Sequence, residues 1–303
     1  MTALRIEGLG VRFRLHGAAV QALSDINLQV RRGELLAVVG ESGCGKSVLA
    51  HALLGLLPRN AQVTGHAYLG EDLDLLHCGE QRLAREVRGR RLGLIPQSPA
   101  TALNPVRTGR RLLAETLRAH GRDPGLAAEV AADAGLDDAD LDRYPFQLSG
   151  GMAQRLTTAL ALATDPPLLI ADEPTTGLDR PLVDHTLDLL RRRCDAGGTV
   201  LLITHDLAAA QRVADTVAVM YASRIAEHRP ARDVFGAPAH PYTAALLDAL
   251  PNWAFTPIPG HPPMLTALPP GCAFAPRCPR RTDACGVQPG GPVACHHPLV
   301  AAA

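Results

Sequence analysis

The chain has 303 residues, of which 47% are hydrophobic and 20% charged, proportions typical of a globular protein with a sizeable core. Its 30 basic and 30 acidic residues give a formal net charge of +0, so no overall charge attracts it to nucleic acid or acidic lipid. No apolar run approaches the roughly 20 residues needed to cross a bilayer, and the first residues lack the apolar core of a signal peptide. We therefore expect a cytosolic protein that acts at a membrane only through partners.

The first 39 residues predict β-structure. Ile26 to Val30 alternates apolar and polar residues with the period of two that is typical of a half-buried strand. An apolar run at residues 35–39 then leads into Gly-Glu-Ser-Gly-Cys-Gly-Lys-Ser at residues 40–47, and a helical pattern follows over residues 48–57. Strand, glycine loop and helix stand in the order that a P-loop needs.

The loop at residues 40–47 predicts a binding site for the phosphates of a nucleotide. Its glycines let backbone N–H groups turn inward, and the following helix N-terminus adds a partial positive charge. Lys46 is placed to reach the β- and γ-phosphates, and Ser47 to hold Mg²⁺. Beside 29 arginines Lys46 is the only lysine, which fits a loop that wraps a compact ammonium rather than a forked guanidinium. The loop residues expected to contact nucleotide are Gly40, Ser42, Gly43, Cys44, Gly45, Lys46 and Ser47.

The middle of the chain predicts a mainly helical insert. The apolar run Leu92–Ile95 leads to Pro96 and Gln97, and a loop rich in helix breakers follows. From residue 110 to about 141 the pattern is helical. We expect a helical subdomain at about residues 98–160.

Ser149, Gly150 and Gly151 lie directly before a predicted helix at about residues 152–163. A hydroxyl and free amides at a helix N-terminus form a second geometry that binds anions. An ordinary serine N-cap explains the same three residues equally well.

An apolar strand at residues 168–171 ends in the adjacent carboxylates Asp172 and Glu173. Asp172 can hold a metal ion through water, and Glu173 can polarise an attacking water. A second buried strand, Thr199–Ile203, ends close to His205, which can donate to a γ-phosphate oxygen. After a last apolar strand at residues 216–220 we expect a polar connector that ends the core near residue 230. Strands that alternate with helices predict an α/β fold with a mostly parallel sheet.

Taken in order, these motifs resemble the ATP-binding subunit of an ABC transporter over residues 1 to about 230. The resemblance implies an ABC-type P-loop NTPase fold with a β-rich N-terminal part and a helical subdomain. The matching segments are residues 40–47 (Walker A), Gln97 (Q-loop), residues 148–152 (signature), residues 168–173 (Walker B), residues 177–179 (D-loop) and His205 (switch histidine).

The resemblance also implies roles for individual residues. Two such domains pair head to tail around ATP, so the signature residues Ser149, Gly150 and Gly151, together with Asp179, are expected at the nucleotide. Glu173 would be the catalytic carboxylate, His205 the γ-phosphate sensor, and Gln97 the link to the membrane subunits. Mg²⁺ would be held by Ser47, Gln97 and Asp172. Ala153 and Gly177 depart from the usual family residues, but neither change removes a group that contacts phosphate, so we expect a competent ATPase.

Three further segments resemble the dipeptide, oligopeptide and nickel importer subfamily: residues 96–105, 240–251 and 271–279. This resemblance implies a C-terminal region at residues 231–303 and a subunit that powers uptake of di- or oligopeptides from the cytoplasmic face of the membrane. Its partners would be two permease subunits, a solute-binding protein and a second ATPase subunit. Nickel or metal-chelate import is one alternative. A non-transport ABC ATPase is another, although no coiled coil or second cassette accompanies these motifs.

Four cysteines cluster near the end of the chain: Cys272, Cys278, Cys285 and Cys295. In a reducing compartment such a cluster indicates a metal site rather than disulfides. Their spacings are longer than those of paired zinc-finger cysteines, so an iron–sulfur cluster suits them as well as zinc. The subfamily resemblance favours a [4Fe–4S] cluster that keeps the tail folded, with zinc as the alternative.

Overall fold

The computed structural model describes residues 1–251 and 253–300. It contains two compact units: residues 1–79 with 203–303 form unit 1, and residues 80–202 form unit 2. Residues 252 and 301–303, which belong to the C-terminal region expected at 231–303, lie outside the described residues. Among the helices described, none is long and apolar enough to cross a bilayer.

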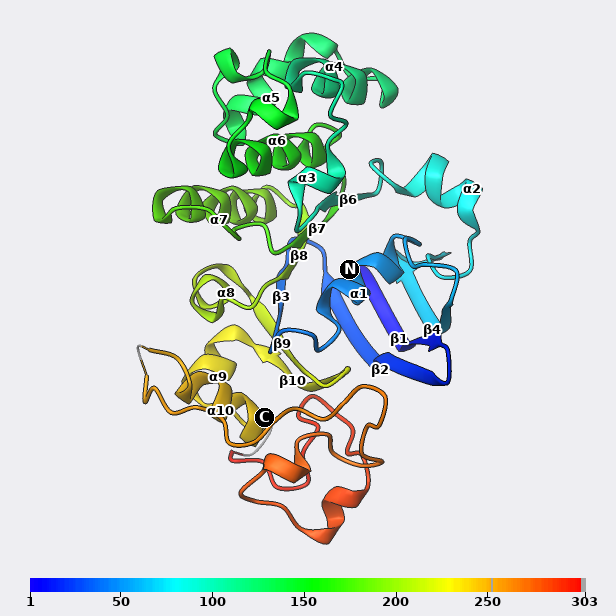
Figure 1. Cartoon of the computed structure of the whole chain (residues 1–303), viewed down its shortest axis with the longest axis vertical. Helices are drawn as coiled ribbons and strands as arrows, with labels where there is room; N and C mark the ends of the chain where they lie inside the picture. Colours follow the sequence, from blue (N-terminus) through cyan, green and yellow to red (C-terminus); the bar gives the residue numbers. More distant parts are fainter. Residues whose placement is uncertain (252, 301–303) are drawn as a thin grey trace. The chain divides into compact units, whose positions relative to one another are not determined.

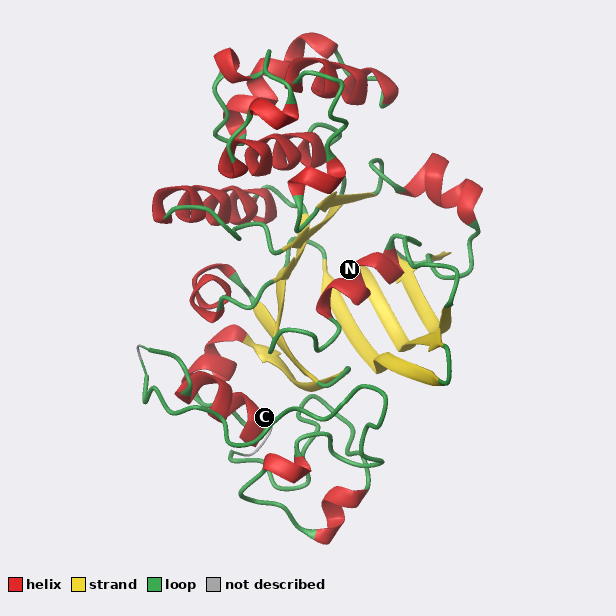
Figure 2. Cartoon of the chain, viewed as in Figure 1, coloured by secondary structure: helices red, strands yellow, loops and turns green. Residues whose placement is uncertain are grey.

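Unit 1 begins with a four-stranded antiparallel sheet of strand order β2-β1-β4-β5 (Figures 1 and 2). In β2 the residues Ile26, Leu28 and Val30 are buried and their neighbours exposed, so the predicted alternation is confirmed. The strands are β1 (Thr2–Leu15), β2 (Ala18–Arg31), β4 (Ala61–Leu69) and β5 (Leu73–Asp74).

A second group of strands in unit 1 carries the glycine loop. Strand β3 (Leu35–Val39) is parallel to β9 (Thr216–Tyr221), and β9 is antiparallel to β10 (Arg224–Pro230). All five residues of β3 are buried, as its continuous apolar run predicts. The helices of this part are α1 (Lys46–Leu53) and α8 (Leu207–Val213).

Two expectations for unit 1 were wrong in detail. The helix after the loop ends at Leu53 rather than at residue 57, because Gly55 adopts a left-handed φ of 64° that terminates it. The segment up to residue 230, expected to be a polar connector, is strand β10. Its polar residue Glu227 is fully buried, which the hydrophobic pattern could not reveal.

The C-terminal part of unit 1 packs on β10. Helices α9 (Ala231–Gly236) and α10 (Pro241–Asp248) are followed by mostly irregular chain with two short 3-10 turns, Ala275–Arg277 and Asp283–Gly286. The tail adds to the free edge of β10, where the Ala294 N–H donates to Ala226 O at 2.9 Å. The Glu227 carboxylate accepts backbone N–H groups of Ala239 and His240 at 3.0 and 2.8 Å.

Unit 2 combines parallel strands with most of the longer helices (Figure 2). Its strand order is β8-β7-β6, with β6 and β7 parallel. The strands are β6 (Leu92–Ile95), β7 (Leu168–Asp172) and β8 (Thr199–Ile203). The helices are α2 (Glu80–Arg82) with a π-turn at Leu83–Val87, α3 (Pro99–Ala102), α4 (Gly109–Ala119), α5 (Ala127–Asp133), α6 (Gly150–Leu162) and α7 (Arg180–Asp195), with 3-10 turns at Pro124–Leu126, Asp138–Asp140 and Pro145–Gln147.

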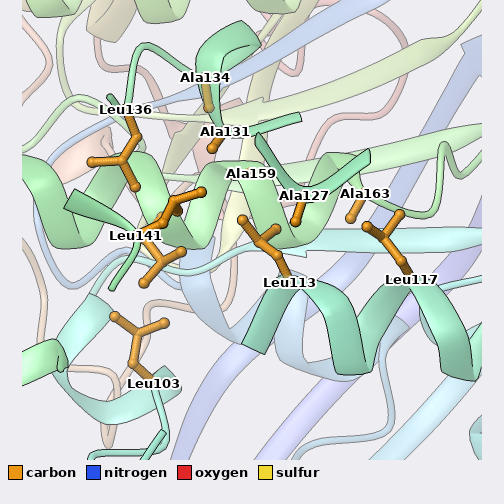
Figure 3. Close-up of a cluster of buried hydrophobic side chains, with 11 residues drawn as sticks. Leu103, Leu113, Leu117, Ala127, Ala131, Ala134, Leu136, Leu141, Ala159 and Ala163 are labelled. Carbon is orange, nitrogen blue, oxygen red and sulfur yellow. The ribbon is translucent and has the colours of Figure 1, made fainter. Parts of the chain in front are cut away.

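Helices α4, α5 and α6 share an apolar core (Figure 3). Leu113 and Leu117 of α4 are fully buried there with Ala131 of α5 and Leu156 of α6. The sequence predicted a helical pattern over residues 110–141 without giving the ends of individual helices. The chain turns after α4, where Gly121 has a φ of 73°, so two helices, α4 and α5, pack against α6.

Candidate nucleotide-binding site and cysteine cluster

The loop between β3 and α1 needs glycine at two positions. Gly40 has a φ of 150°, and a Cβ there would lie 2.0 Å from Met220 O. Gly45 has a φ of 111°, and its Cβ would lie 2.3 Å from Ala22 O. Any side chain would collide with backbone at both places, so the tight approach of the loop to β9 and β2 depends on glycine.

Lys46 opens helix α1 and is buried, with 7% of its surface exposed. Its Nζ donates to Gly40 O at 2.8 Å and to Glu41 O at 3.1 Å. The Cys44 sulfur lies 3.9 Å from Nζ, and burial raises the pKa of this thiol. The ammonium is therefore the positive charge held inside the loop, beside a neutral thiol and the half-buried Ser47.

Unit 1 also places His205 beside the strand that feeds the loop. The Thr204 N–H donates to Val38 O of β3 at 3.1 Å. Asp206 caps α8 by accepting the Ala209 N–H at 3.0 Å. His205 lies between these two anchored residues with an exposed side chain. The structure thus places His205 next to the end of β3, the strand that precedes the loop.

Unit 2 gathers the predicted carboxylates at one strand end. Ile95 of β6 pairs with Ala171 of β7, so Gln97 and Asp172 follow parallel neighbours at the same edge. Asp172 and Glu173 are 3% and 6% exposed. Glu173 has a φ of 50°, a left-handed conformation that costs a non-glycine residue on the order of 1–3 kcal/mol and is typical of functional sites.

Ser149 and Asp179 of unit 2 are both helix N-caps. Ser149 Oγ accepts the Met152 N–H at 3.3 Å, and Asp179 Oδ1 accepts the Leu182 N–H at 3.2 Å. Ser149 and Gly150 are exposed, and Gly151 is half-buried. The capping bonds account for the local positions of both side chains, while contact of these residues with nucleotide stays a prediction.

Comparison with known proteins identifies the family. Residues 23–176 match the family described as ABC transporter, and residues 226–285 match the oligopeptide/dipeptide transporter, C-terminal region. The chain belongs to the ABC transporter family. The predicted motifs can therefore be called by their family names.

Several curated ABC transporter proteins are similar over most of this chain. The dipeptide transport ATP-binding protein DppD of Bacillus subtilis is 43% identical, over 95% of this chain and 90% of that protein. The probable peptide ABC transporter ATP-binding protein y4tR of Sinorhizobium fredii is 40% identical, over 96% and 94%. The oligopeptide transport ATP-binding protein OppD of Mycobacterium bovis is 40% identical over 93% of this chain, which spans 48% of that protein.

The fold is that of solved ABC cassettes. The dimeric structure of MJ0796, a bacterial ABC transporter cassette, has a TM-score of 0.68 at 25% identity, and the match covers 76% of this chain and 99% of that one. A post-hydrolysis structure of the same cassette, bound to ADP and Pi, has a TM-score of 0.69 at 24% identity. The predicted ABC-type α/β fold is confirmed.

Three residues beside the Walker A loop were missed by sequence reasoning. The Glu41 N–H donates to the Tyr242 hydroxyl at 3.2 Å. Arg277 Nη1 lies 3.4 Å from the Glu41 carboxylate and donates to the Tyr221 hydroxyl at 3.1 Å. Glu41 and Arg277 are 236 positions apart, and no local pattern marks such a pair. The cysteine-containing tail thus reaches the ATP-binding loop of this ABC transporter chain.

The four tail cysteines line one small cavity together with His240. The Arg280 N–H donates to Cys278 Sγ at 3.4 Å, and the His297 N–H donates to Cys295 Sγ at 3.3 Å. Burial raises the pKa of Cys272, Cys278 and Cys295. Amides aimed at sulfur favour thiolates, and thiolates are the form that binds metal.

The spacing of these sulfurs tests which metal centre fits. Among the described residues, no three cysteine sulfurs lie within 4.8 Å of one another. Four sulfurs bound to a single zinc ion at about 2.3 Å would lie about 3.8 Å apart. His296 and His297 bond to Val287 O and to the Thr282 hydroxyl at 2.9 and 2.6 Å. The donor set is four cysteines, arranged more widely than one tetrahedral ion requires.

Proposed function

We propose that this chain is the ATP-hydrolysing subunit of an ABC importer that takes up di- or oligopeptides through membrane permease partners. The observation that carries the proposal is the match of residues 226–285 to the oligopeptide/dipeptide transporter C-terminal region. The relatives described above carry dipeptide, peptide or oligopeptide names. Nickel import is not favoured by these names, and neither is a non-transport role.

We assign the following roles in ATP binding and hydrolysis to individual residues. Walker A amides and Lys46 bind the phosphates, and Glu173 orients the attacking water while His205 senses the γ-phosphate. The oxygen donors of Ser47, Gln97 and Asp172 suit Mg²⁺, a hard cation that neutralises charge on the phosphates. The buried, left-handed Glu173 and the buried Lys46 support these assignments.

We propose that a second ATPase subunit binds against the exposed signature residues. Ser149, Gly150 and Asp179 would face nucleotide held by that subunit, so that hydrolysis depends on pairing. The subunit would act at the cytoplasmic face of the membrane, bound to two permeases and supplied by a solute-binding protein. The exposure of Ser149 and Gly150 supports this role.

We further propose a [4Fe–4S] cluster on Cys272, Cys278, Cys285 and Cys295. The wide sulfur spacing supports a cluster over zinc, and the amide hydrogen bonds to sulfur stabilise the thiolates that either metal centre needs. Protein purified without oxygen should contain iron and sulfide in equal amounts. Cys285→Ser should lose both, whereas Cys78→Ser, outside the cavity, should keep them. Zinc without sulfide would contradict the assignment.

Uptake by cells tests the importer function. Cells that lack this chain receive wild type, Glu173→Gln, or the matched control Glu129→Gln, whose side chain is exposed on α5, and labelled di- and tripeptides are supplied beside nickel. We expect wild type and the control to restore peptide uptake. Glu173→Gln should fail, because its ATPase rate falls by about 100-fold or more. Restored nickel uptake without peptide uptake would contradict the peptide assignment.

A further inference from the structure

A second group of metal-ligating side chains lies on the outer face of the antiparallel sheet in unit 1. Among the described residues, His66, Asp74 and His77 form the one group of three or more His, Cys, Asp or Glu whose ligand atoms lie within 4.8 Å of one another. None of the nucleotide or cysteine residues discussed above belongs to it. Its position on β4 and β5 therefore calls for a separate explanation.

The hairpin of β4 and β5 brings these three side chains together. Tyr68 pairs with Asp74 and Leu69 with Leu73. Ala67 and Leu69 are buried, whereas His66 is exposed, so the pleat sends His66 to the outer face. Asp74 lies between the buried Leu73 and Leu75 and reaches the same face. The position of the group follows from strand register.

The Asp74 carboxylate is fixed by two backbone amides. Its Oδ1 accepts the Ala67 N–H at 3.2 Å and the Leu76 N–H at 3.1 Å. Its Oδ2 lies 2.6 Å from His66 Nδ1 and 2.8 Å from His77 Nδ1. One carboxylate oxygen is thus held in place by the hairpin, while the other faces two imidazole nitrogens.

The two imidazoles are oriented but open to solvent. The His66 ring stacks on Tyr68 with centroids 5.7 Å apart and planes 11° apart. The rings of His66 and His77 have centroids 4.9 Å apart. Their side chains are 51% and 57% exposed, against 18% for Asp74. Water can therefore complete the coordination of an ion held by these three residues.

The neighbouring charges of Arg5 and Glu7 cancel, so the negative charge of Asp74 remains for a cation. Arg5 lies over the Tyr68 ring at 4.4 Å, and it forms an ion pair with Glu7. Burial raises the pKa of Asp74, but hydrogen bonds from His66, the Ala67 amide, His77 and the Leu76 amide outweigh it, and the pKa lies below its ordinary value. Asp74 is therefore an anion at neutral pH, available to a cation.

We propose that His66, Asp74 and His77 bind a divalent transition-metal ion of the zinc or nickel class. Two imidazole nitrogens and one carboxylate oxygen match the ligand preference of these ions, whereas Mg²⁺ and Ca²⁺ prefer oxygen ligands alone. The ion replaces the protons that the two Nδ1 atoms share with Asp74 Oδ2. The distance from the ion to each nitrogen is about 2.1 Å, which needs the nitrogens to move slightly away from Oδ2. The hydrogen bonds from the Ala67 and Leu76 amides orient the Asp74 carboxylate, as the hydrogen-bond partners of metal ligands commonly do.

The test counts bound nickel on the full chain by equilibrium dialysis against Ni²⁺. Wild type is compared with His66→Gln, His77→Gln and their double variant, and with His261→Gln, an exposed histidine outside the group. Any ion bound by the tail cysteines cancels from the difference in nickel count, because all these chains keep the same four cysteines. We expect wild type and His261→Gln to bind one more ion per chain than the double variant, and each single variant to bind at least tenfold more weakly.

A second variant separates ligation from folding. Asp74→Asn keeps a carbonyl oxygen for the two backbone amides but removes the charge, so nickel affinity should fall about tenfold while thermal unfolding stays close to wild type. Equal nickel counts in wild type and the double variant would overturn the proposal. The three residues would then form a hydrogen-bonded histidine–aspartate–histidine cluster only.

Discussion

At the scale of single residues, Lys46 is unique in its residue type and occupies a specific position in the Walker A loop. It is the only lysine among 30 basic residues, and its Nζ donates to Gly40 O and Glu41 O. A guanidinium is planar and cannot place its charge at one point between two carbonyls. The role of this residue was predictable, because the glycine pattern of residues 40–47 determines the conformation of the loop.

Replacing Lys46 with Arg should therefore abolish most ATPase activity although the charge is kept. Loss of one preorganised donor to the phosphates costs on the order of 100- to 1000-fold in rate, and the larger head group also disturbs the loop. The rate of phosphate release measures this. Arg59→Lys, on an exposed residue, is the matched control and should keep the wild-type rate. A Lys46→Arg rate within tenfold of wild type would contradict the assigned role.

His240 is the residue whose protonation should limit stability in acid. It is 2% exposed and its Nδ1 accepts the Tyr242 N–H at 3.0 Å. Burial lowers its pKa from 6.5 to about 4, because a charged imidazole has no water there.

The folded-state pKa of His240 lies below the unfolded one, so the unfolded chain binds the extra proton. Stability is complete above pH 6.5 and falls as pH drops toward 4, by up to about 3 kcal/mol. Urea unfolding between pH 7 and 4.5 measures this. His240→Asn keeps an N-cap without titrating, and its stability curve should be flatter over that range. Parallel curves for the two proteins would argue against His240 as the source.

At the scale of elements, the core of α4, α5 and α6 should behave as close-packed. Leu113 of α4 is fully buried in it (Figure 3). Leu113→Ala should lower the free energy of unfolding of unit 2 by about 2–5 kcal/mol, because the cavity is only partly closed by its neighbours. Urea unfolding measures the loss. Leu56→Ala, at a side chain 49% exposed, should change stability by less than about 0.5 kcal/mol.

The contact between the tail and the Walker A loop should affect ATP binding. Without Arg277, the Glu41 carboxylate keeps its charge close to the phosphate loop and repels ATP. Arg277→Ala should raise the KM for ATP about fivefold, equivalent to roughly 1 kcal/mol of coupling. Glu41→Gln should have a smaller effect, and combining both changes should largely cancel the defect of Arg277→Ala. Additive effects in steady-state kinetics would show that the pair does not act together.

These elements also show what the sequence could and could not predict. Strands β2, β3, β7 and β8 were predictable, since their apolar patterns match a sheet covered on one face or both. Strand β10 was missed, because Glu227 is polar yet buried, with backbone donors at Ala239 and His240, 12 and 13 positions further along the chain. The loop residues of the ATP site follow from local motifs. The Arg277–Glu41 pair does not, since only folding brings residues 236 positions apart together.

At the scale of the whole molecule, the tail of unit 1 stabilises the fold that precedes it. Val293 bridges to Glu227, and His228 donates its N–H to Pro292 O at 2.7 Å. A chain ended after residue 230 would lose the amide partners of Glu227 and expose the edge of β10. Arg229, which pairs with the Glu227 carboxylate at 3.1 Å, would remain, but a buried carboxylate that loses its backbone donors costs about 1–3 kcal/mol, and a bare strand edge favours aggregation.

The shortened chain of residues 1–230 should therefore unfold at a lower temperature than the full chain and elute as aggregates in size-exclusion chromatography. Adding Glu227→Leu to the shortened chain should recover part of the lost stability, because an apolar side chain replaces a carboxylate that has lost its backbone donors. A second chain ended after residue 249 keeps the Ala239 and His240 amides and should be intermediate. Equal melting temperatures for all three would contradict this dependence.

The burial of Lys46 has a consequence for chemical labelling. Because it is the only lysine and its ammonium is engaged by Gly40 O and Glu41 O, an amine-directed reagent has a single side-chain target. That target reacts only when the loop opens and the ammonium loses its proton. The acylation rate of Lys46, measured by mass spectrometry on the peptide that contains it, therefore reports local opening of one loop. ATP should slow the acylation of Lys46 in proportion to its occupancy of the site, and the measurement needs no engineered label.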